Sequence, residues 1–239
     1  MSRLGLEYDH ILGINVNSSS EREVLRVVGD LISHSRKFCL FSANPELLVM
    51  TTGDPELKKT INQAEIVIPD GFGLKLAKAD LPILKGRKFF LKLFALAKEK
   101  HWRTFLLGGQ NLPQVIPGPR LNRRGEPVSP TEAEKEKKIM RMINQVKPDL
   151  LFVGFGMPKQ EYWLARNLPK LDIKGAMTVG GTFDYVFGKA KLPPVWLENL
   201  GLEWLWRLVR DPKRFGRIFN ATIKFPLLFF RDLVAKFIK

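Results

Sequence analysis

One aspartate follows an apolar run and stands directly before two closely spaced glycines. The segment IVIPDGFG places Asp70 after the apolar residues, with Gly71 and Gly73 behind it. Glycines at such a turn let the backbone approach a ligand, and a helix that starts there offers free N–H groups to a phosphate. A carboxylate at this point suits a general base that takes a proton from an attacking hydroxyl. The alternative is that Asp70 only caps the following helix.

A hydroxyl and a carboxamide end another apolar run. The segment KFCLFSANPE places Ser42 and Asn44 after the residues KFCLF. Both side chains can hydrogen-bond to sugar hydroxyls or to a phosphate. The alternative is ordinary turn chemistry, because Ser, Asn and Pro are frequent in turns.

Two further glycine turns carry polar residues. GFGMPKQE follows the apolar run LLFV and places Gln160 and Glu161 in the first turn of a predicted helix. Gln160 can reach a sugar or a uracil edge, whereas Glu161 can also simply complement the helix dipole. Gly180 and Gly181 follow the run AMTV, where close approach to a ligand and a simple tight turn are both open.

Near the C-terminus, Arg207, Arg210, Arg214 and Arg217 recur at spacings of three, four and three. On one continuous helix these side chains would share a face, although the Asp211-Pro212 step interrupts that helix. Guanidinium groups suit diphosphate oxygens. The alternative is a solvated, charged face.

Apolar strands alternate with helices along most of the chain. This pattern predicts an α/β fold with a mainly parallel, Rossmann-like sheet covered by helices. Predicted strands include residues 9–16, and a helix is expected directly after Gly71. Each glycine turn follows a predicted strand, so the turns should share one crevice beyond the carboxyl ends of the strands.

Two segments depart from the alternating pattern. Residues 111–130 contain five prolines, two glycines and three arginines, which predicts a long loop. A capping box of Thr131 and Glu134 predicts the start of the next helix.

We assign residues 1–195 to the α/β core and residues 196–239 to a basic, amphipathic helical appendage, interrupted near Asp211-Pro212 and at Pro226.

The formal net charge of +15 over 239 residues indicates a polyanionic partner or surface. Residues 74–103 and 201–239 each hold nine Lys and Arg, against two and three acids. The second stretch is also rich in Trp, Phe and Leu, which favours an anionic membrane surface over nucleic acid. A lone Cys39, no secretory signal and no run of 18 apolar residues predict a cytoplasmic protein on the inner face of the membrane.

Several signatures of other chemistries are missing from the sequence. The three histidines are scattered, so no metal centre and no cofactor are expected. The chain has no Asp-x-Asp, no Walker motif and no GxSxG elbow. Leu76 stands where the last glycine of a dinucleotide fingerprint belongs. A nucleotide-binding oxidoreductase and a non-enzymatic membrane- or RNA-binding module remain the alternatives, and the sequence leaves open whether the chain is a homo-oligomer.

Taken together, the motifs resemble one family over about residues 8–220. SANPE, IPDGFG, FLLGG, PDLLFVGFGMPKQEYW, VGGTFDYVFGKAKLPP and GLEWLWRL occur in the order and spacing of the WecG/TagA/CpsF glycosyltransferases. The resemblance implies metal-independent, inverting transfer from a UDP-sugar, often UDP-N-acetylmannosamine, to an undecaprenyl-diphosphate-linked sugar. Such enzymes act in the synthesis of teichoic acid, enterobacterial common antigen or capsule.

The resemblance also implies roles for individual residues. Asp70 matches the catalytic aspartate, and Ser42 and Asn44 match its neighbouring Thr and Asn. The remaining matches are the Gln of the PKQE element and the arginines thought to hold the lipid diphosphate: Gln160, Arg207, Arg214 and Arg217. The family's tail is expected to dock on the membrane and complete the site. Two stretches depart from the family pattern, namely 85–88, which reads KGRK in place of T-G-x-D, and the 111–130 loop.

Overall fold

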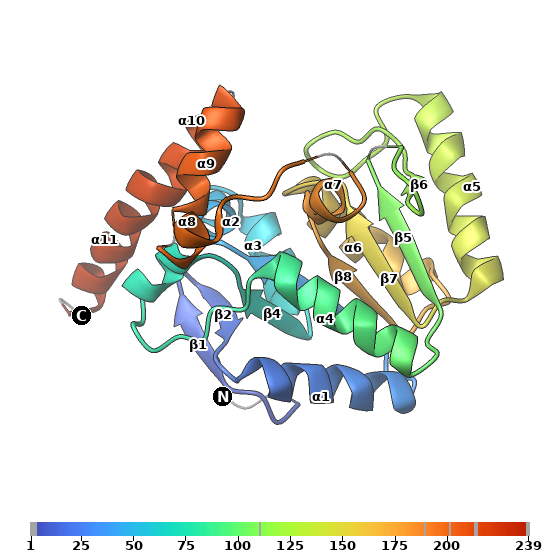
Figure 1. Cartoon of the computed structure of the whole chain (residues 1–239), viewed down its shortest axis with the longest axis horizontal. Helices are drawn as coiled ribbons and strands as arrows, with labels where there is room; N and C mark the ends of the chain where they lie inside the picture. The colour runs from blue at the N-terminus through green and yellow to red at the C-terminus, as the bar shows by residue number, and fades with distance from the viewer. Residues whose placement is uncertain (1–3, 110, 189, 201, 213–214, 238–239) are drawn as a thin grey trace.

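A computed structural model describes residues 4–109, 111–188, 190–200, 202–212 and 215–237. Its centre is a six-stranded, all-parallel sheet with the strand order β4-β3-β8-β7-β5-β6 (Figure 1). The α/β, Rossmann-like prediction is therefore confirmed. The strands of this sheet are β3 (Phe38–Ala43), β4 (Ile66–Pro69), β5 (Thr104–Gly108), β6 (Ile116–Pro117), β7 (Leu150–Gly154) and β8 (Gly175–Thr178).

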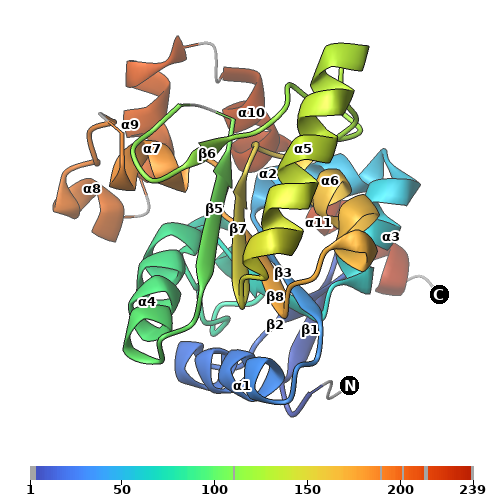
Figure 2. The ribbon, with the colours of Figure 1, turned by 90° about the vertical axis from the view of Figure 1, so that its right-hand side faces the viewer.

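The central strands are apolar on both faces because helices cover both sides of the sheet. Helices α1, α4 and α7 pack on one face, and α2, α3, α5 and α6 pack on the other. Figure 2 shows α4 and α5 on opposite sides of the sheet. Neighbouring residues of β3 alternate between the two cores, so that Leu40 packs with α1 and α4 while Phe41 packs with α2 and α3.

Several helices of this part of the chain begin with a side-chain cap, whereas α4, α6 and α7 have none. Ser20 and Glu23 form a capping box at α1, and Asn44 and Asp54 cap α2 and α3. The bounds are α1 (Glu21–Ser33), α2 (Pro45–Thr52), α3 (Pro55–Gln63), α4 (Gly86–Glu99), α5 (Pro130–Val146), α6 (Lys159–Asn167) and α7 (Thr182–Val186), with a 3-10 turn η2 (Leu168–Lys170) after α6.

Three predictions of local structure were wrong. The strand expected over 9–16 is a separate hairpin of β1 (Tyr8–Ile11) and β2 (Ile14–Asn17), because Leu12 and Gly13 both adopt positive φ and reverse the chain. The cap of α5 is Ser129, whose hydroxyl accepts from the Glu132 N–H, so this helix begins before the predicted capping box.

The third wrong prediction concerns the segment after Asp70. Only a 3-10 helix η1 (Phe72–Leu76) forms there, and α4 does not start until Gly86. Gly71 lies at positive φ and Gly73 falls inside the first turn, and glycine disfavours a longer helix. The expected loop 111–130 is mostly irregular, apart from β6 and the paired positions Leu112–Val115 and Leu121–Pro127.

The appendage is helical and lies at one end of the sheet (Figure 1). They are α8 (Val195–Asn199), α9 (Glu203–Arg210), α10 (Phe215–Phe219), the π-helical turn η4 (Asn220–Lys224) and α11 (Phe225–Phe237). The break expected at Asp211-Pro212 is present, whereas Pro226 causes no break. Pro226 lies two residues after the π-helical turn η4, and the helical run from 215 to 237 continues through it. Phe225 is completely buried and belongs to the same core as α2.

Among the described residues, no helix combines the length and apolarity that crossing a bilayer requires.

Candidate active site

A cavity of about 1630 Å³ lies over the carboxyl ends of β3, β4, β5, β7 and β8. Its walls come from the turns after these strands, from the 111–130 loop and from the appendage. The position agrees with the rule that parallel sheets bind ligands beyond the carboxyl ends of their strands. The residues expected from the sequence that line this cavity are Ser42, Asn44, Asp70, Gly71, Gly73, Gln160, Gly180, Gly181 and Arg217.

Ser42 and Asp70 form a hydrogen-bonded pair in this cavity. The Ser42 hydroxyl donates to Asp70 Oδ2 over 3.2 Å. The parallel pairing of β3 with β4 aligns their ends, and the Asp70 N–H donates to the Ala43 carbonyl over 2.7 Å. The cap position of η1 is Gly71, without a side-chain cap. Asp70 therefore does not act as the cap of the following helix.

Gly86 is a site residue that the sequence analysis missed. A Cβ at this position would lie 2.7 Å from Ser42 Oγ and 3.0 Å from Asp70 Oδ2, so only glycine lets α4 approach the pair so closely. Gly86 is the first residue of α4, and the positive end of a helix dipole favours a carboxylate anion. The only sequence signal was the glycine within the unusual KGRK stretch.

Asn44 caps a helix and also lines the cavity. Its Oδ1 accepts from the Leu47 N–H over 2.9 Å and so caps α2. The same residue lines the cavity, and its Nδ2 has no partner within the part of the chain that is described. The amide N–H groups of Asn44 are therefore available to a ligand.

Gln160 ties two glycine turns together. Its Oε1 accepts from the Gly156 N–H over 3.2 Å and from the Gly180 N–H over 3.0 Å. Both glycines adopt positive φ, and a Cβ at Gly180 would meet nothing within 4 Å. The bonds hold the turns after β7 and β8 in one arrangement and occupy two N–H groups that a phosphate could otherwise take.

Glu161 is completely buried and is not among the residues that line the cavity. Gln160 Nε2 donates to Glu161 Oε1 over 2.7 Å, whereas Oε2 satisfies no hydrogen-bond geometry with the described residues. Burial raises the pKa of Glu161 to about 7, although the bond from Gln160 acts in the opposite direction. The structure thus places Glu161 in contact with Gln160, and not at the surface of the cavity.

The four arginines do not share one helix, as the Asp211-Pro212 step indicated, because α9 ends at Arg210 and α10 begins at Phe215. Arg217 lines the cavity and pairs with Glu46 of α2 through Nε–Oε1 at 2.7 Å and Nη2–Oε2 at 3.1 Å. The Arg210 guanidinium instead stacks 4.7 Å from the centre of the Trp206 ring. Arg214 and the side chain of Arg207 lie outside the described residues.

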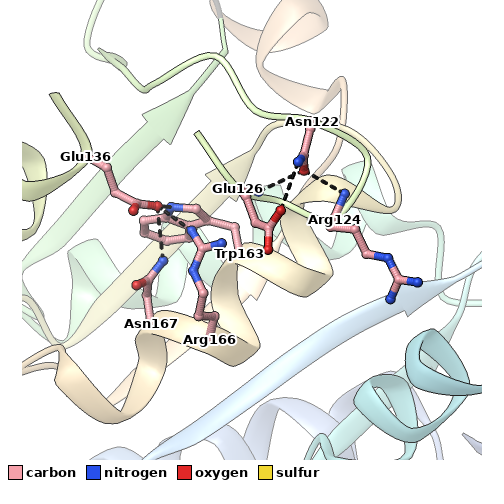
Figure 3. Close-up of polar contacts among 7 residues, drawn as sticks. All are labelled: Asn122, Arg124, Glu126, Glu136, Trp163, Arg166 and Asn167. Carbon is pink, nitrogen blue, oxygen red and sulfur yellow. Dashed lines mark hydrogen bonds and ion pairs between the residues drawn. The ribbon is translucent and has the colours of Figure 1, made fainter. Parts of the chain in front are cut away.

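The 111–130 loop forms part of the cavity wall through Pro119, Arg120, Leu121 and Val128. Figure 3 shows how the loop is built near α6, with Asn122 Oδ1 accepting from the backbone N–H groups of Arg124 and Glu126. Gly125 lies directly against α6, since a Cβ there would be 2.6 Å from the backbone nitrogen of Trp163. The loop is therefore packed onto the helix that carries Gln160.

A side chain of α5 also contacts this helix. Glu136 Oε1 accepts from Trp163 Nε1 and from Arg166 Nη2, both over 2.6 Å, and from Asn167 Nδ2 over 3.4 Å (Figure 3).

Among the described residues, no three His, Cys, Asp or Glu side chains gather in a way that could hold a metal ion.

Comparison with known proteins agrees with this geometry. The model of the Glycosyl transferase WecG/TagA/CpsF family matches residues 9–238. Two similar proteins are both called N-acetylglucosaminyldiphosphoundecaprenol N-acetyl-beta-D-mannosaminyltransferase. The one from Staphylococcus aureus strain MRSA252 is 28% identical over 225 residues, and the one from strain MW2 is 27% identical over 227 residues. Each alignment covers 89% of this chain and 89% of the relative. The family match over nearly the whole length shows that this chain is a glycosyltransferase of the WecG/TagA/CpsF family.

Proposed function

We propose that this enzyme transfers a sugar, N-acetylmannosamine by analogy with the named relatives, from a UDP-sugar to an N-acetylglucosaminyl-diphosphoundecaprenol acceptor. The observation that carries the proposal is the Ser42–Asp70 pair, which faces a cavity large enough for two sugars and a nucleotide. The relatives' shared name supplies the acceptor and the transferred sugar.

In the proposed reaction, Asp70 takes the proton from an acceptor hydroxyl. The acceptor oxygen then attacks the anomeric carbon of the donor and forms the new glycosidic bond. The bond from that carbon to the UDP oxygen breaks on the opposite face, and UDP leaves with the electron pair, so the configuration inverts. Ser42 holds one Asp70 oxygen through its hydroxyl, and the N-terminus of α4 favours the charged carboxylate that the reaction needs.

Negative charge grows on the leaving diphosphate, and the cavity offers positive groups to meet it. Basic side chains line it from several elements: Lys75, Lys85, Arg87, Arg120, Lys159 and Arg217. Such groups can stabilise a diphosphate by electrostatic preorganisation. We therefore propose that the transfer needs no metal ion.

The test is an assay with UDP-N-acetylmannosamine and a short-chain polyprenyl-diphosphate N-acetylglucosamine, with product detected by mass spectrometry. We expect Asp70→Asn to lower kcat by about 10²- to 10⁴-fold, the usual contribution of a general base. UDP binding should persist in this variant, because the change is isosteric. Near wild-type turnover in Asp70→Asn would show that Asp70 is not the base. Loss of wild-type activity in EDTA, restored by a divalent metal, would contradict metal independence.

We also propose that the appendage docks this enzyme on the inner face of an anionic membrane, where a lipid-linked acceptor would be held. Exposed apolar side chains occur all along it, and exposed Arg210, Lys224 and Arg231 lie among them. Apolar residues beside basic ones are typical of interfacial helices. Among the described residues of 196–239, the exposed apolar side chains are Trp196, Leu200, Trp204, Leu205, Val209, Phe215, Phe219, Ile223, Leu227, Phe230, Leu233 and Val234.

A further inference from the structure

Glu46 is a buried carboxylate at the wall of the cavity. Its position and its partner, Arg217, both indicate a role in substrate binding as well as in stability. We propose that Glu46 is a positioning residue, which holds the guanidinium of Arg217 in the orientation that binds a substrate diphosphate. The proposal rests on the proposed function, because it takes the ligand of Arg217 to be the diphosphate of the donor or of the acceptor. Glu46 and Arg217 both line the cavity, although 171 positions separate them in the chain.

The contact leaves part of the guanidinium available. Glu46 accepts from Nε and Nη2 of Arg217, so the carboxylate binds one edge of the planar group. Arg217 Nη1 has no hydrogen-bond partner in the described part of the chain, and the side chain is 47% exposed. An arginine held in this way still presents N–H donors, and its fixed fork suits phosphate oxygens.

Glu46 itself is well fixed. It is the second residue of α2, which Asn44 caps and whose Leu47 and Leu48 are completely buried. The helix dipole favours its negative charge at this position. Because α2 starts three residues after Ser42, the Glu46 contact places Arg217 at a set position relative to the Ser42–Asp70 pair.

The alternative explanation is that the ion pair only fastens the appendage to the core. The appendage has other contacts with the core, since Phe225 is completely buried in the same core as α2. A buried ion pair is in general weak evidence for stability. A positioning role requires that the ion pair lie at the cavity and that Arg217 keep N–H donors for a ligand. A role in fastening the appendage requires neither.

The chain contains a matched control for Glu46. Glu56 is also the second residue of a helix, follows a proline in the same Pro-Glu-Leu sequence and pairs with an arginine, Arg124. The Glu56 side chain is 63% exposed and does not line the cavity. Glu56→Gln therefore removes the same charge from an equivalent helix position, away from the site.

The experiment compares Glu46→Gln, Glu46→Asp and Glu56→Gln in two assays. The first measures kcat and the KM values of the UDP-sugar and of the short-chain lipid acceptor. The second measures binding of UDP and of farnesyl diphosphate by calorimetry, with no turnover required. We expect Glu46→Gln to raise the KM of one of the two substrates by about 10- to 100-fold, the effect of a misplaced binding group. Binding of the matching diphosphate should weaken in parallel, Glu46→Asp should recover part of the loss, and Glu56→Gln should behave as wild type.

The two assays identify which diphosphate Arg217 binds. Weaker UDP binding assigns it to the donor, and weaker farnesyl diphosphate binding assigns it to the acceptor. Unchanged KM values and unchanged binding of both probes in Glu46→Gln would overturn the proposal, whether or not the melting temperature falls. An equal loss in Glu56→Gln would also overturn it. If wild type transfers no sugar but binds a diphosphate in a Glu46-dependent manner, the proposed donor and acceptor are wrong while the positioning role stands.

Discussion

Replacing Gly86 by alanine should damage the active site while leaving the fold intact. The new Cβ would lie 2.7 Å from Ser42 Oγ, which is 0.7 Å short of the 3.4 Å at which ordinary contact begins, and 3.0 Å from Asp70 Oδ2. Either these side chains or the start of α4 must move by several tenths of an ångström. A misplacement of about 1 Å at a reacting centre can lower the rate about 10²-fold. We therefore expect kcat to fall by about 10- to 100-fold in Gly86→Ala.

The free energy of unfolding should change much less than the rate. Alanine is favoured over glycine in a helix by up to about 1 kcal/mol, which offsets part of the strain. Gly29→Ala is the matched control, because Gly29 lies inside α1 and its Cβ would meet only Trp102, at an ordinary 3.9 Å. This control should be as active as wild type.

The assay is steady-state transfer to the short-chain lipid acceptor, with urea unfolding of each variant measured in parallel. A Gly86→Ala enzyme with wild-type kcat would refute the reasoning, since the Ser42–Asp70 geometry would then not limit the reaction. A loss of several kcal/mol of stability would refute it in another way, because the effect would then lie in the fold and not in the site.

Two further predictions concern pH and membranes. Burial raises the pKa of Glu161 from 4.5 in the unfolded chain to about 7 in the folded state, so the folded state holds this proton more tightly. The contribution of Glu161 to the free energy of unfolding should therefore fall by about 3 kcal/mol as pH rises through this range. Glu161→Gln should lack this component in urea unfolding measured from pH 4 to pH 8, and an unchanged pH profile would contradict the assignment. The full chain should float with vesicles of anionic lipid and less with neutral ones, with binding weakened by salt. The double variant Trp196→Glu and Leu227→Glu should float less than the surface control Val146→Glu, and equal flotation of the two would argue against docking through the appendage.

Local patterns were sufficient to predict the sheet and the edge where its ligand belongs. Apolar runs such as KFCLF and LLFV carry their own signal, and parallel strands align their carboxyl ends at one edge. Ser42 and Asp70 could be placed together for this reason. The same patterns could not reveal the reversal at Leu12 and Gly13, because an apolar residue rarely adopts the positive φ found there. The cap of α5 was also missed, since Ser129 and Thr131 are both acceptable caps by type alone.

The sequence by itself determined the alternation of strands and helices around the parallel sheet, the excess of positive charge and the polar residues that follow β3, β4, β7 and β8. Only the tertiary structure decided that Gly86 lies against Ser42 and Asp70, that Gln160 joins two turns, and that Arg217 pairs with Glu46. The physical reason is that periodicity and turn chemistry act over a few neighbouring residues. Contacts between residues 16 to 171 positions apart depend instead on how whole helices pack against the sheet.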